Sequence, residues 1–549
     1  MFTLHWPERR RHASQAGHGV CIIDPGRAGM RGPDTRNIDH YTEAMAAVLR
    51  ERPGAESQMA DDRQHTVGEE TMNKRAGADA PSIETQPGRP VPGSSYTLES
   101  LAQTISCLSR SEDMQSYLQD ASGLAAEGLP ALVFRPDSVE QVVQIVRACH
   151  QEGRRLTIQG GRSGLAGGAV PDEGDVVLAL ERLDRVDEFD TAGGTITVQA
   201  GMILENLCAL VEDQGWYFPL DLGARGSCQV GGNVATNAGG NRVLRYGTTR
   251  ELVLGLEVVL ADGTVMTMLN KGLKNNTGLD LKHLFIGTEG TLGVITRVVL
   301  RLFPKPERRY SALAAVAGLD QVARLLKLAR ARLPELSSFE VMWRNYLVAA
   351  GQVLQKTPPF EARYPICVLL ETEGRDTPEA AAALEGFLGE MLDSGDVLDA
   401  IIPHSQEQAA MLWKFRDSIG EILRTIQPRV AFDIGIPLQK MEAFIDVVCA
   451  GLSRMSPKAH NLLFGHLGDG NLHLSTGPHA PENLMAVEEL VYREVERVGG
   501  SISAEHGIGR IKKPFLKHSR GAAELALMQQ VKRALDGGAE LNRHRVVDA

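Results

Sequence analysis

The sequence lacks the features that mark disulfide-rich, membrane-spanning or nucleic-acid-binding proteins. Its cysteines are odd in number, scattered and without a Cys-x-x-Cys pair, which speaks against a disulfide framework or a zinc ribbon and favours a reducing compartment. The best apolar run, Leu252–Leu260, is shorter than the roughly 18–20 residues of a membrane span and carries Glu257. The formal net charge of −11 disfavours a nucleic-acid partner. We therefore expect a water-soluble enzyme.

The first 94 residues carry little structural information. Met1–Pro7 has no apolar core of a secretory signal, and the basic run Arg9–Arg11 only faintly resembles a mitochondrial transit peptide because acidic residues soon follow. Residues 1–94 mix Pro, Gly, Arg and Asp without sustained periodicity, which predicts disorder apart from a short helix at Asp39–Arg50. Met72 is an alternative start of the protein.

A chain of 549 residues is too long for one hydrophobic core, so two or more domains are expected. Order is predicted from Ser95 onward. The Pro304-Lys305-Pro306 sequence interrupts the pattern and predicts a boundary, with one domain over 95–306 and another over 307–549. No internal repeat is evident.

The first predicted domain contains a strand at 130–136, a helix at 139–150, a strand at 156–158 and a glycine-rich loop at 160–171. Such glycines let backbone N–H groups approach a pyrophosphate without Cβ clashes. The loop matches neither a Walker A nor a Rossmann sequence, and a plain surface loop is an equal alternative.

Two further glycine-rich stretches follow, at 219–240 and 285–296. Their many small residues permit close backbone approach to a large flat ligand. Between them, the Asp262-Gly263 turn predicts a β-hairpin from the strands 252–260 and 264–269.

The second half alternates helices with strands, which predicts an antiparallel sheet covered by helices and hence an α+β domain. The expected helices are 319–333, 378–392, 406–426, 437–452 and 481–498, and the expected strands are 338–342, 366–371, 431–436, 461–465 and 472–475.

Histidines and an acid gather near the C-terminus in a pattern that suits a metal. His466 and His473 are seven residues apart, and Glu505 stands beside His506. Imidazole and carboxylate together favour zinc or manganese and leave one imidazole over. A spacing of seven fits one face of a helix, but the glycines at 468 and 470 favour a turn between two strands, which would bring both histidines together.

These stretches, in this order, resemble the vanillyl-alcohol-oxidase-type flavoproteins with a PCMH-type FAD-binding domain. Within them the chain resembles the D-2-hydroxyacid dehydrogenases, above all those acting on D-2-hydroxyglutarate and also D-lactate dehydrogenases. The resemblance rests on Pro219–Gly223, Gly231–Gly240, Leu281–Gly293, His466–His473 and Ser503–Gly509. It implies a PCMH-type FAD domain followed by an α+β substrate domain with an antiparallel sheet.

The resemblance also implies roles for individual residues. The metal ligands correspond to His466, His473 and Glu505, the catalytic base to His506, and the arginine for the substrate carboxylate to Arg416. Without the resemblance, Arg416 would be taken as a solvated helix residue. The flavin-binding positions correspond to Gly160, Gly161, Arg162, Ser163, Gly164, Leu165, Gly167, Gly168, Pro219, Asp221, Gly231, Gly232, Ala235, Thr236, Asn237, Gly239, Gly240, Glu289, Gly290, Gly293, Val294 and Ile295.

The implied reaction oxidises a D-2-hydroxy acid to the 2-oxo acid. The hydroxyl proton leaves to a base, and hydride passes from C2 to the flavin. A divalent metal, zinc or alternatively manganese, serves as Lewis acid and template. A neutral imidazole suits the base, and a guanidinium suits a carboxylate. Because the turn at Arg162-Ser163-Gly164 contains no histidine, we expect noncovalent FAD.

Three positions and the C-terminal segment depart from the family pattern. Enzymes that oxidise 2-hydroxyglutarate carry Thr, Lys and Asn where this chain has Gly420, Ala431 and Ser475, so the reaction type is expected to carry over but the substrate is not. Relatives end in an Asn-Pro-Gly-Lys-like turn against the flavin, whereas Leu541–His544 stands here.

Other readings remain at this point. The chain could be a D-lactate- or glycolate-type oxidase subunit, a non-catalytic flavin-binding subunit, or a metal-dependent hydrolase that leaves the glycine-rich stretches unexplained. The expected partners are a small 2-hydroxy acid and an electron acceptor, either a quinone or an electron-transfer flavoprotein. A homodimer is one possible assembly. The expected location is cytoplasmic, with peripheral membrane attachment, or mitochondria in a eukaryote, as alternatives.

Overall fold

The computed structural model of the protein describes residues 96–538 and 540–549. The disorder predicted for 1–94 and the helix predicted at Asp39–Arg50 lie outside the described residues. In the part of the chain that is described, every helix is too short or too polar to serve as a membrane span.

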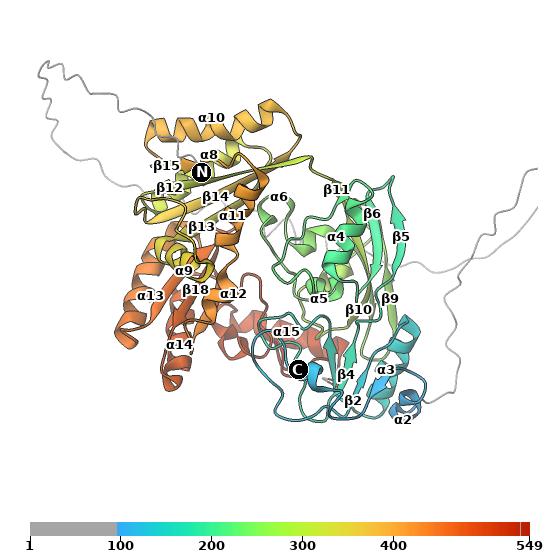
Figure 1. Ribbon diagram of the computed structural model, residues 1–549. Coiled ribbons are helices and arrows are strands. Elements are labelled where there is room, and N and C mark those ends of the chain that lie inside the picture. The colour runs from blue at the N-terminus through green and yellow to red at the C-terminus, as the bar shows by residue number, and fades with distance from the viewer. Residues whose placement is uncertain (1–95, 539) are drawn as a thin grey trace, which may run out of the picture. The chain divides into compact units, whose positions relative to one another are not determined.

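The first half contains a small four-stranded sheet and a five-stranded antiparallel sheet (Figure 1). The small sheet has the order β1-β2-β4-β3 and the larger one β5-β6-β10-β8-β9, while β7 pairs with β11. The strands are β1 (Cys107–Leu108), β2 (Leu132–Phe134), β3 (Leu156–Gln159), β4 (Val176–Ala179), β5 (Val186–Asp190), β6 (Thr195–Gln199), β7 (Trp216–Tyr217), β8 (Val253–Val259), β9 (Val265–Met268), β10 (Val294–Arg301) and β11 (Phe303–Pro304). The helices are α2 (Leu98–Ala102), α3 (Val139–Gln151), α4 (Leu204–Glu212), α5 (Val230–Ala235), α6 (Val243–Tyr246) and α7 (Thr249–Leu252), with 3-10 turns at Gln115–Tyr117 and Leu281–Leu284.

The β2-α3-β3 unit forms as the hydrophobic pattern predicts. Strand β4 is buried throughout and pairs in parallel with β2 and β3, which fits strands covered on both faces. Helix α3 buries Val142, Ile145 and Val146 against this sheet and starts where the hydroxyl of Ser138 accepts a hydrogen bond from the Gln141 backbone N–H. The β8–β9 hairpin also has the predicted antiparallel pairing.

The second half is a seven-stranded sheet whose pairs are all antiparallel, in the order β15-β12-β14-β13-β17-β18-β16. This confirms the predicted α+β class. The strands are β12 (Arg308–Val316), β13 (Leu336–Trp343), β14 (Ile366–Gly374), β15 (Asp399–Ile401), β16 (Val430–Gly435), β17 (His460–Gly465) and β18 (Asn471–Gly477). The helices are α8 (Leu319–Arg332), α9 (Arg344–Leu354), α10 (Pro378–Ser394), α11 (Gln406–Arg416), α12 (Ile419–Leu423), α13 (Met441–Met455), α14 (Leu484–Val498) and α15 (Ala522–Leu535), with 3-10 turns at Leu438–Lys440, Pro481–Asn483 and Lys513–His518.

Helices cover both faces of this sheet. Apolar residues of α8, α10, α13 and α14 form one core with one face, and those of α9, α11 and α12 form another with the opposite face (Figure 1). Helix α9 and strands β12 and β15 were not predicted from the sequence.

One predicted helix is wrong. The helix expected over 406–426 is broken into α11 and α12 at Asp417–Ser418. The hydroxyl of Ser418 donates to the Lys414 carbonyl at 2.5 Å and so competes with the helical hydrogen-bond pattern. The break leaves Arg416 as the last residue of α11, next to the candidate active site described below.

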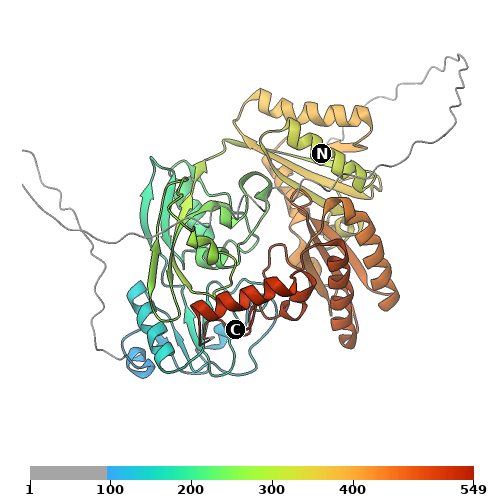
Figure 2. The ribbon, with the colours of Figure 1, turned by 180° about the vertical axis from the view of Figure 1, so that it is seen from behind.

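The end of the chain returns to the first half. Apolar residues of α15 pack against the first core, and Figure 2 shows this red helix beside the first-half strands. Beyond it, Leu541 forms a parallel bridge with Leu156 of β3. The Asn542 side chain accepts from Ile158 N at 2.8 Å and donates to the Glu289 carbonyl at 2.6 Å. The C-terminal segment therefore holds two segments of the first half together.

Replacing Asn542 is expected to weaken this connection. Asn542→Ala removes both hydrogen bonds and leaves a partly buried N–H and a buried carbonyl without these partners, which should lower the free energy of unfolding by about 2–4 kcal/mol. Urea denaturation measures the change. Arg543→Ala, at the exposed neighbouring position, is the control and should change little; equal stability of the two variants would contradict the prediction.

Candidate active site

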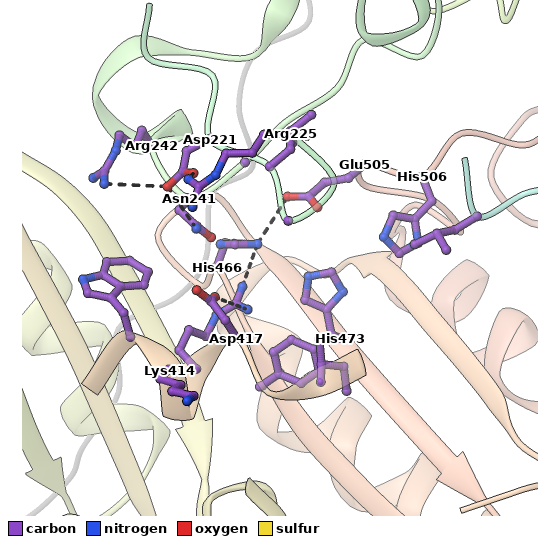
Figure 3. A pocket seen from close by; sticks show the side chains of 18 of the residues that line it. Asp221, Arg225, Asn241, Arg242, Lys414, Asp417, His466, His473, Glu505 and His506 are labelled. Carbon is purple, nitrogen blue, oxygen red and sulfur yellow. Dashed lines mark hydrogen bonds and ion pairs between the residues drawn. The ribbon is translucent and has the colours of Figure 1, made fainter. Parts of the chain in front are cut away.

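A cavity of about 1210 Å³ lies between the glycine-rich segments of the first half and the sheet of the second. Its lining includes Arg416, His466, His473, Glu505 and His506, which are the five residues predicted to bind metal or to act in catalysis. Figure 3 shows His466, His473, Glu505 and His506 directed toward one another. The structure therefore brings together residues that lie up to ninety positions apart in the sequence.

The two histidines sit on a hairpin, so the helical alternative is wrong. His466 follows β17, His473 lies in β18 opposite Phe464, and the turn passes through Gly470 at φ +86°. A positive φ favours glycine over residues with a side chain. The imidazole rings are 5.4 Å apart.

Glu505 completes a set of three possible metal ligands. One ligand atom from each of His466, His473 and Glu505 lies within 4.8 Å of the others, and His466 Nε2 is 3.4 Å from Glu505 Oε1. That carboxylate oxygen is buried and has no hydrogen-bond partner among the described residues. Two imidazoles and a free carboxylate oxygen fit a divalent cation such as zinc.

Glu340 orients His466 of this ligand set and the neighbouring Arg416. Its carboxylate accepts from His466 Nδ1 and from Arg416 Nε, each at 2.7 Å. Burial alone would lower the pKa of His466, but the carboxylates of Glu340 and Glu505 outweigh it and raise that pKa to about 9. A second partner on the far ring nitrogen is the usual way to fix the orientation of a ligating histidine.

Arg416 is almost completely buried beside the same histidine. Its Nη2 lies 3.1 Å from His466 Nε2, and its guanidinium stacks over Phe464 at 5.1 Å. The salt bridge to Glu340 uses Nε, whereas Nη2 faces His466 and Nη1 lies 3.8 Å from Asp417, so the Nη edge faces the ligand group. Its predicted role toward a substrate carboxylate stays a prediction.

The loop that carries Glu505 and His506 is anchored by a buried carboxylate, Asp433 of β16. Asp433 Oδ2 accepts from the backbone N–H groups of Glu505 at 3.0 Å and His506 at 2.8 Å. Lys512 Nζ lies 3.5 Å away and offsets the negative charge. Burial would raise the pKa of Asp433, but nearby positive groups and these hydrogen bonds hold it far below its usual value.

His506 lies close to the ligand set without belonging to it. Its ring stacks 5.9 Å from that of His473, and burial lowers its pKa, which favours the neutral imidazole needed in a base. Asp433, His473 and His506 form a second possible ligand group. Glu505 is the freer carboxylate, because Asp433 is already occupied by N–H groups and Lys512, so we favour the first set.

The predicted flavin segments lie against one another. A Cβ on Gly161 would meet the Ser227 carbonyl at 2.0 Å, and one on Gly240 would meet the Asp221 carbonyl at 2.4 Å. By contrast, Gly164 and Gly232 face open space. Several buried polar atoms here have no partner among the described residues, namely Gln159 Oε1, Gln229 Oε1 and Asn233 Oδ1. Open glycine backbone together with unpaired polar atoms fits a large polar ligand such as FAD.

The remaining flavin positions fall into two groups. Two positions contact the second half of the chain. A Cβ added to Gly239 would lie 3.2 Å from the Glu505 side chain, and the Glu289 carboxylate accepts from the Ile508 and Gly509 N–H groups. The others lie within the first half: Arg162, Ser163, Leu165, Gly167, Gly168, Pro219, Ala235, Thr236, Asn237 and Gly290 lie on or beside the loops, whereas Gly160, Gly231, Gly293, Val294 and Ile295 pack against neighbouring protein atoms. A Cβ on Gly160 would meet Gln229 and Gly232 of the second glycine-rich stretch.

Three residues of this region were missed from the sequence: Glu340, Asp433 and Asn542. Glu340 and Asp433 are single acids inside otherwise apolar strands, Phe339-Glu340-Val341 and Phe432-Asp433-Ile434. A lone acid in an apolar strand indicates that the acid has a buried partner, because burying an unpaired charge is costly.

Comparisons with known proteins agree with this architecture. Residues 130–269 match the family described as "FAD binding domain", and residues 305–546 match "FAD linked oxidases, C-terminal domain". A mitochondrial D-2-hydroxyglutarate dehydrogenase of Rattus norvegicus is 40% identical over 426 residues, which cover 77% of this chain and 79% of the rat protein. The D-2-hydroxyglutarate dehydrogenase of Xanthomonas citri pv. viticola is 39% identical over 75% of this chain and 88% of its own.

Among solved structures, p-cresol methylhydroxylase matches with a TM-score of 0.66 at 16% identity, covering 80% of this chain and 94% of that one. Alkyldihydroxyacetonephosphate synthase matches with a TM-score of 0.61 at 16% identity, covering 80% of this chain and 82% of that one. These likenesses confirm the PCMH-type fold. The chain therefore belongs to the family of FAD-linked D-2-hydroxyacid dehydrogenases, oxidoreductases that act on a CH–OH group.

Proposed function

We propose that the protein oxidises a D-2-hydroxy acid to the 2-oxo acid at a site built from a divalent metal, noncovalent FAD and the His506 imidazole. The observation that carries the proposal is the adjacency of two sets of residues. The ligand group His466, His473 and Glu505 lies in one cavity with His506, and Glu505 approaches Gly239 of a flavin segment. The names of the relatives point to the same reaction.

Each residue has a defined task in this reaction. His506 accepts the proton of the substrate hydroxyl, and Arg416 pairs with the C1 carboxylate through the guanidinium edge that Glu340 leaves free. Three side chains, His466, His473 and Glu505, would hold the metal. When bound, the metal supplies Lewis acidity and FAD supplies the acceptor for the C2 hydride. The substrate loses two hydrogens. The hydrogen on C2 leaves as hydride with both electrons, and the hydroxyl hydrogen leaves as the proton that His506 accepts.

Further properties belong to the proposal. Zinc fits the ligands, with manganese as the alternative. The absence of histidine in the Arg162–Gly164 turn supports noncovalent FAD. A quinone or an electron-transfer flavoprotein would reoxidise the flavin. The cytoplasmic location and a homodimer stay predictions. The family assignment excludes the hydrolase, which did not explain the FAD domain.

Anaerobic flavin reduction tests the proposal. Purified protein reconstituted with FAD and Zn²⁺ is mixed with D-lactate, D-malate, D-2-hydroxyglutarate and longer D-hydroxy acids, and loss of visible flavin absorbance is recorded. At least one D-acid should bleach the flavin while its L-enantiomer does not. Bleaching by none of the acids would contradict the proposed reaction.

Removal of the metal is expected to abolish most of this activity. Dialysis against EDTA should slow flavin reduction at least tenfold while the flavin stays bound, because the flavin segments and the ligand group involve different residues. Adding Zn²⁺ back should restore the rate, and His473→Ala should remove both the metal content and its restoration. Full activity in a preparation shown to be free of metal would contradict the metal assignment.

A further inference from the structure

Arg429 is a cation in the wall of the active-site cavity. It immediately precedes β16 and lines the same cavity as His473 and His506. Its Nε is buried and has no hydrogen-bond partner among residues 96–538 and 540–549, and within those residues no carboxylate forms an ion pair with it. Burial lowers its pKa, but a guanidinium stays charged at neutral pH.

Other arginines with a buried, unpartnered nitrogen differ from Arg429 in this respect. Each of them has a carboxylate nearby: Glu181 at 3.8 Å from Arg135 and 3.6 Å from Arg162, Glu371 at 2.6 Å from Arg242, and Asp187 at 2.9 Å from Arg297. An unpaired, partly desolvated charge is costly. At the wall of a substrate cavity, a ligand anion can supply the missing partner.

The strand register directs Arg429 toward the substrate side. Asp433 pairs with His473 and Ala431 pairs with Ser475, and the backbone of Arg429 lies against Gly477. Because alternate residues of a strand share a face, Arg429, Ala431 and Asp433 lie on the face that carries His473.

The path along the strand from Arg429 to Asp433, whose partner on β18 is the ligand His473, is about 13 Å long, because it spans four residue steps of roughly 3.3 Å each. Small residues line this path. Ala431 is exposed to the cavity, Ser475 is its neighbour on β18, and both belong to the cavity wall. The arginine side chain covers part of the distance, and an extended substrate chain can occupy the rest.

We propose that Arg429 binds a terminal anionic group of the substrate, so that the enzyme prefers elongated 2-hydroxy acids with a second carboxylate over monocarboxylates of the same chain length. This inference rests on the proposed function. The length of the path favours spacers longer than that of 2-hydroxyglutarate. Glu488 also lines the cavity, but burial raises its pKa to about 7 and Lys512 is its positive neighbour, so it opposes a second anion only weakly.

Two matched substrates isolate the terminal charge. D-2-Hydroxyadipate and D-2-hydroxyhexanoate have the same carbon chain and differ in the terminal carboxylate. Anaerobic flavin reduction by the holoenzyme should give a kcat/KM at least tenfold higher for the diacid. Arg429→Gln should lower the diacid value about ten- to a hundredfold, chiefly through KM, and leave the monoacid value within about twofold, because a charge-assisted hydrogen bond is lost only with the diacid. Arg429→Lys should recover part of the loss.

Arg308→Gln is the matched control. Arg308 lines the same cavity from β12, five strands from β16 in the sheet and hence about 24 Å away. This variant should keep the diacid preference. Calorimetric titration with the unreactive diacid adipate provides a second readout, with weaker binding to Arg429→Gln than to wild type.

The outcomes separate this inference from the proposed function. Equal kcat/KM for the two acids in the wild type, or an equal loss for both in Arg429→Gln, would overturn the role of Arg429 while leaving the oxidation of hydroxy acids in place. Flavin reduction by no D-2-hydroxy acid would overturn the proposed function itself. Thermal unfolding of each variant shows whether the comparison is made on folded protein.

Discussion

His506→Ala is expected to lower the rate of flavin reduction by a D-2-hydroxy acid about a hundred- to ten-thousandfold, the usual contribution of a general base. Burial lowers the pKa of His506 and so keeps its imidazole neutral. The backbone of His506 is held by Asp433, so removing the imidazole should leave the loop and Glu505 in place. FAD content and metal content should therefore match the wild type. Stopped-flow absorbance measures the rate.

A matched control is His404→Ala, which removes an exposed imidazole and should leave the rate unchanged. His506→Gln retains a neutral hydrogen-bonding group of related size and should be as slow as the alanine variant, because an amide cannot take up the proton. Normal bleaching by His506→Ala would show that another group serves as the base. A simultaneous loss of metal would instead assign His506 to the ligand set with Asp433 and His473.

Asp433→Asn is expected to weaken metal binding about ten- to a hundredfold, although Asp433 is not in the favoured ligand set. The amide is nearly isosteric, but it loses the charge that faces Lys512, and an NH2 donor replaces one of the two oxygens that can accept from the Glu505 and His506 N–H groups. If the amide nitrogen faced the Glu505 and His506 N–H groups, two donors would meet and no hydrogen bond would form there. Glu505 would then be held less firmly in ligand position.

Metal titration followed by calorimetry measures this effect independently of turnover. Asp446→Asn, on the exposed side of α13, is the control and should bind metal as tightly as the wild type. Unchanged metal affinity in Asp433→Asn would show that the Ser503–Gly507 loop keeps its geometry without the carboxylate. Ser503 depends on the same carboxylate, since its hydroxyl also donates to Asp433 at 3.2 Å.

Local sequence patterns predicted much of the fold. The apolar alternation and spacing in 132–159 predicted β2, α3 and β3, and the Asp-Gly turn predicted the β8–β9 hairpin. Such elements depend on side-chain periodicity and turn chemistry within a few residues, which the sequence displays directly. The helix over 406–426 failed because a single hydroxyl, that of Ser418, competes for a helical carbonyl, and periodicity does not register this competition.

Family resemblance supplied most of the site, and residue types alone supplied less. Two histidines, an acid and glycines pointed to a metal on a turn, and the hairpin that carries them was favoured by Gly468 and Gly470. Arg416 could not be told from a solvated arginine by helix periodicity. Its burial depends on Glu340, which lies seventy-six positions earlier, in β13.

The sequence by itself determined the order of the segments and, through its resemblance to known enzymes, the family and the class of reaction. Tertiary structure alone decided which acids act on the site. Glu340 and Asp433 reach it through the pairing of β13 with β17 and of β16 with β18, while the return of the chain end to β3 places Asn542 between Ile158 and Glu289. The same register sets Arg429 on the substrate face. Contacts between distant segments depend on how strands align in space, and a one-residue shift of register would turn each of these side chains to the opposite face.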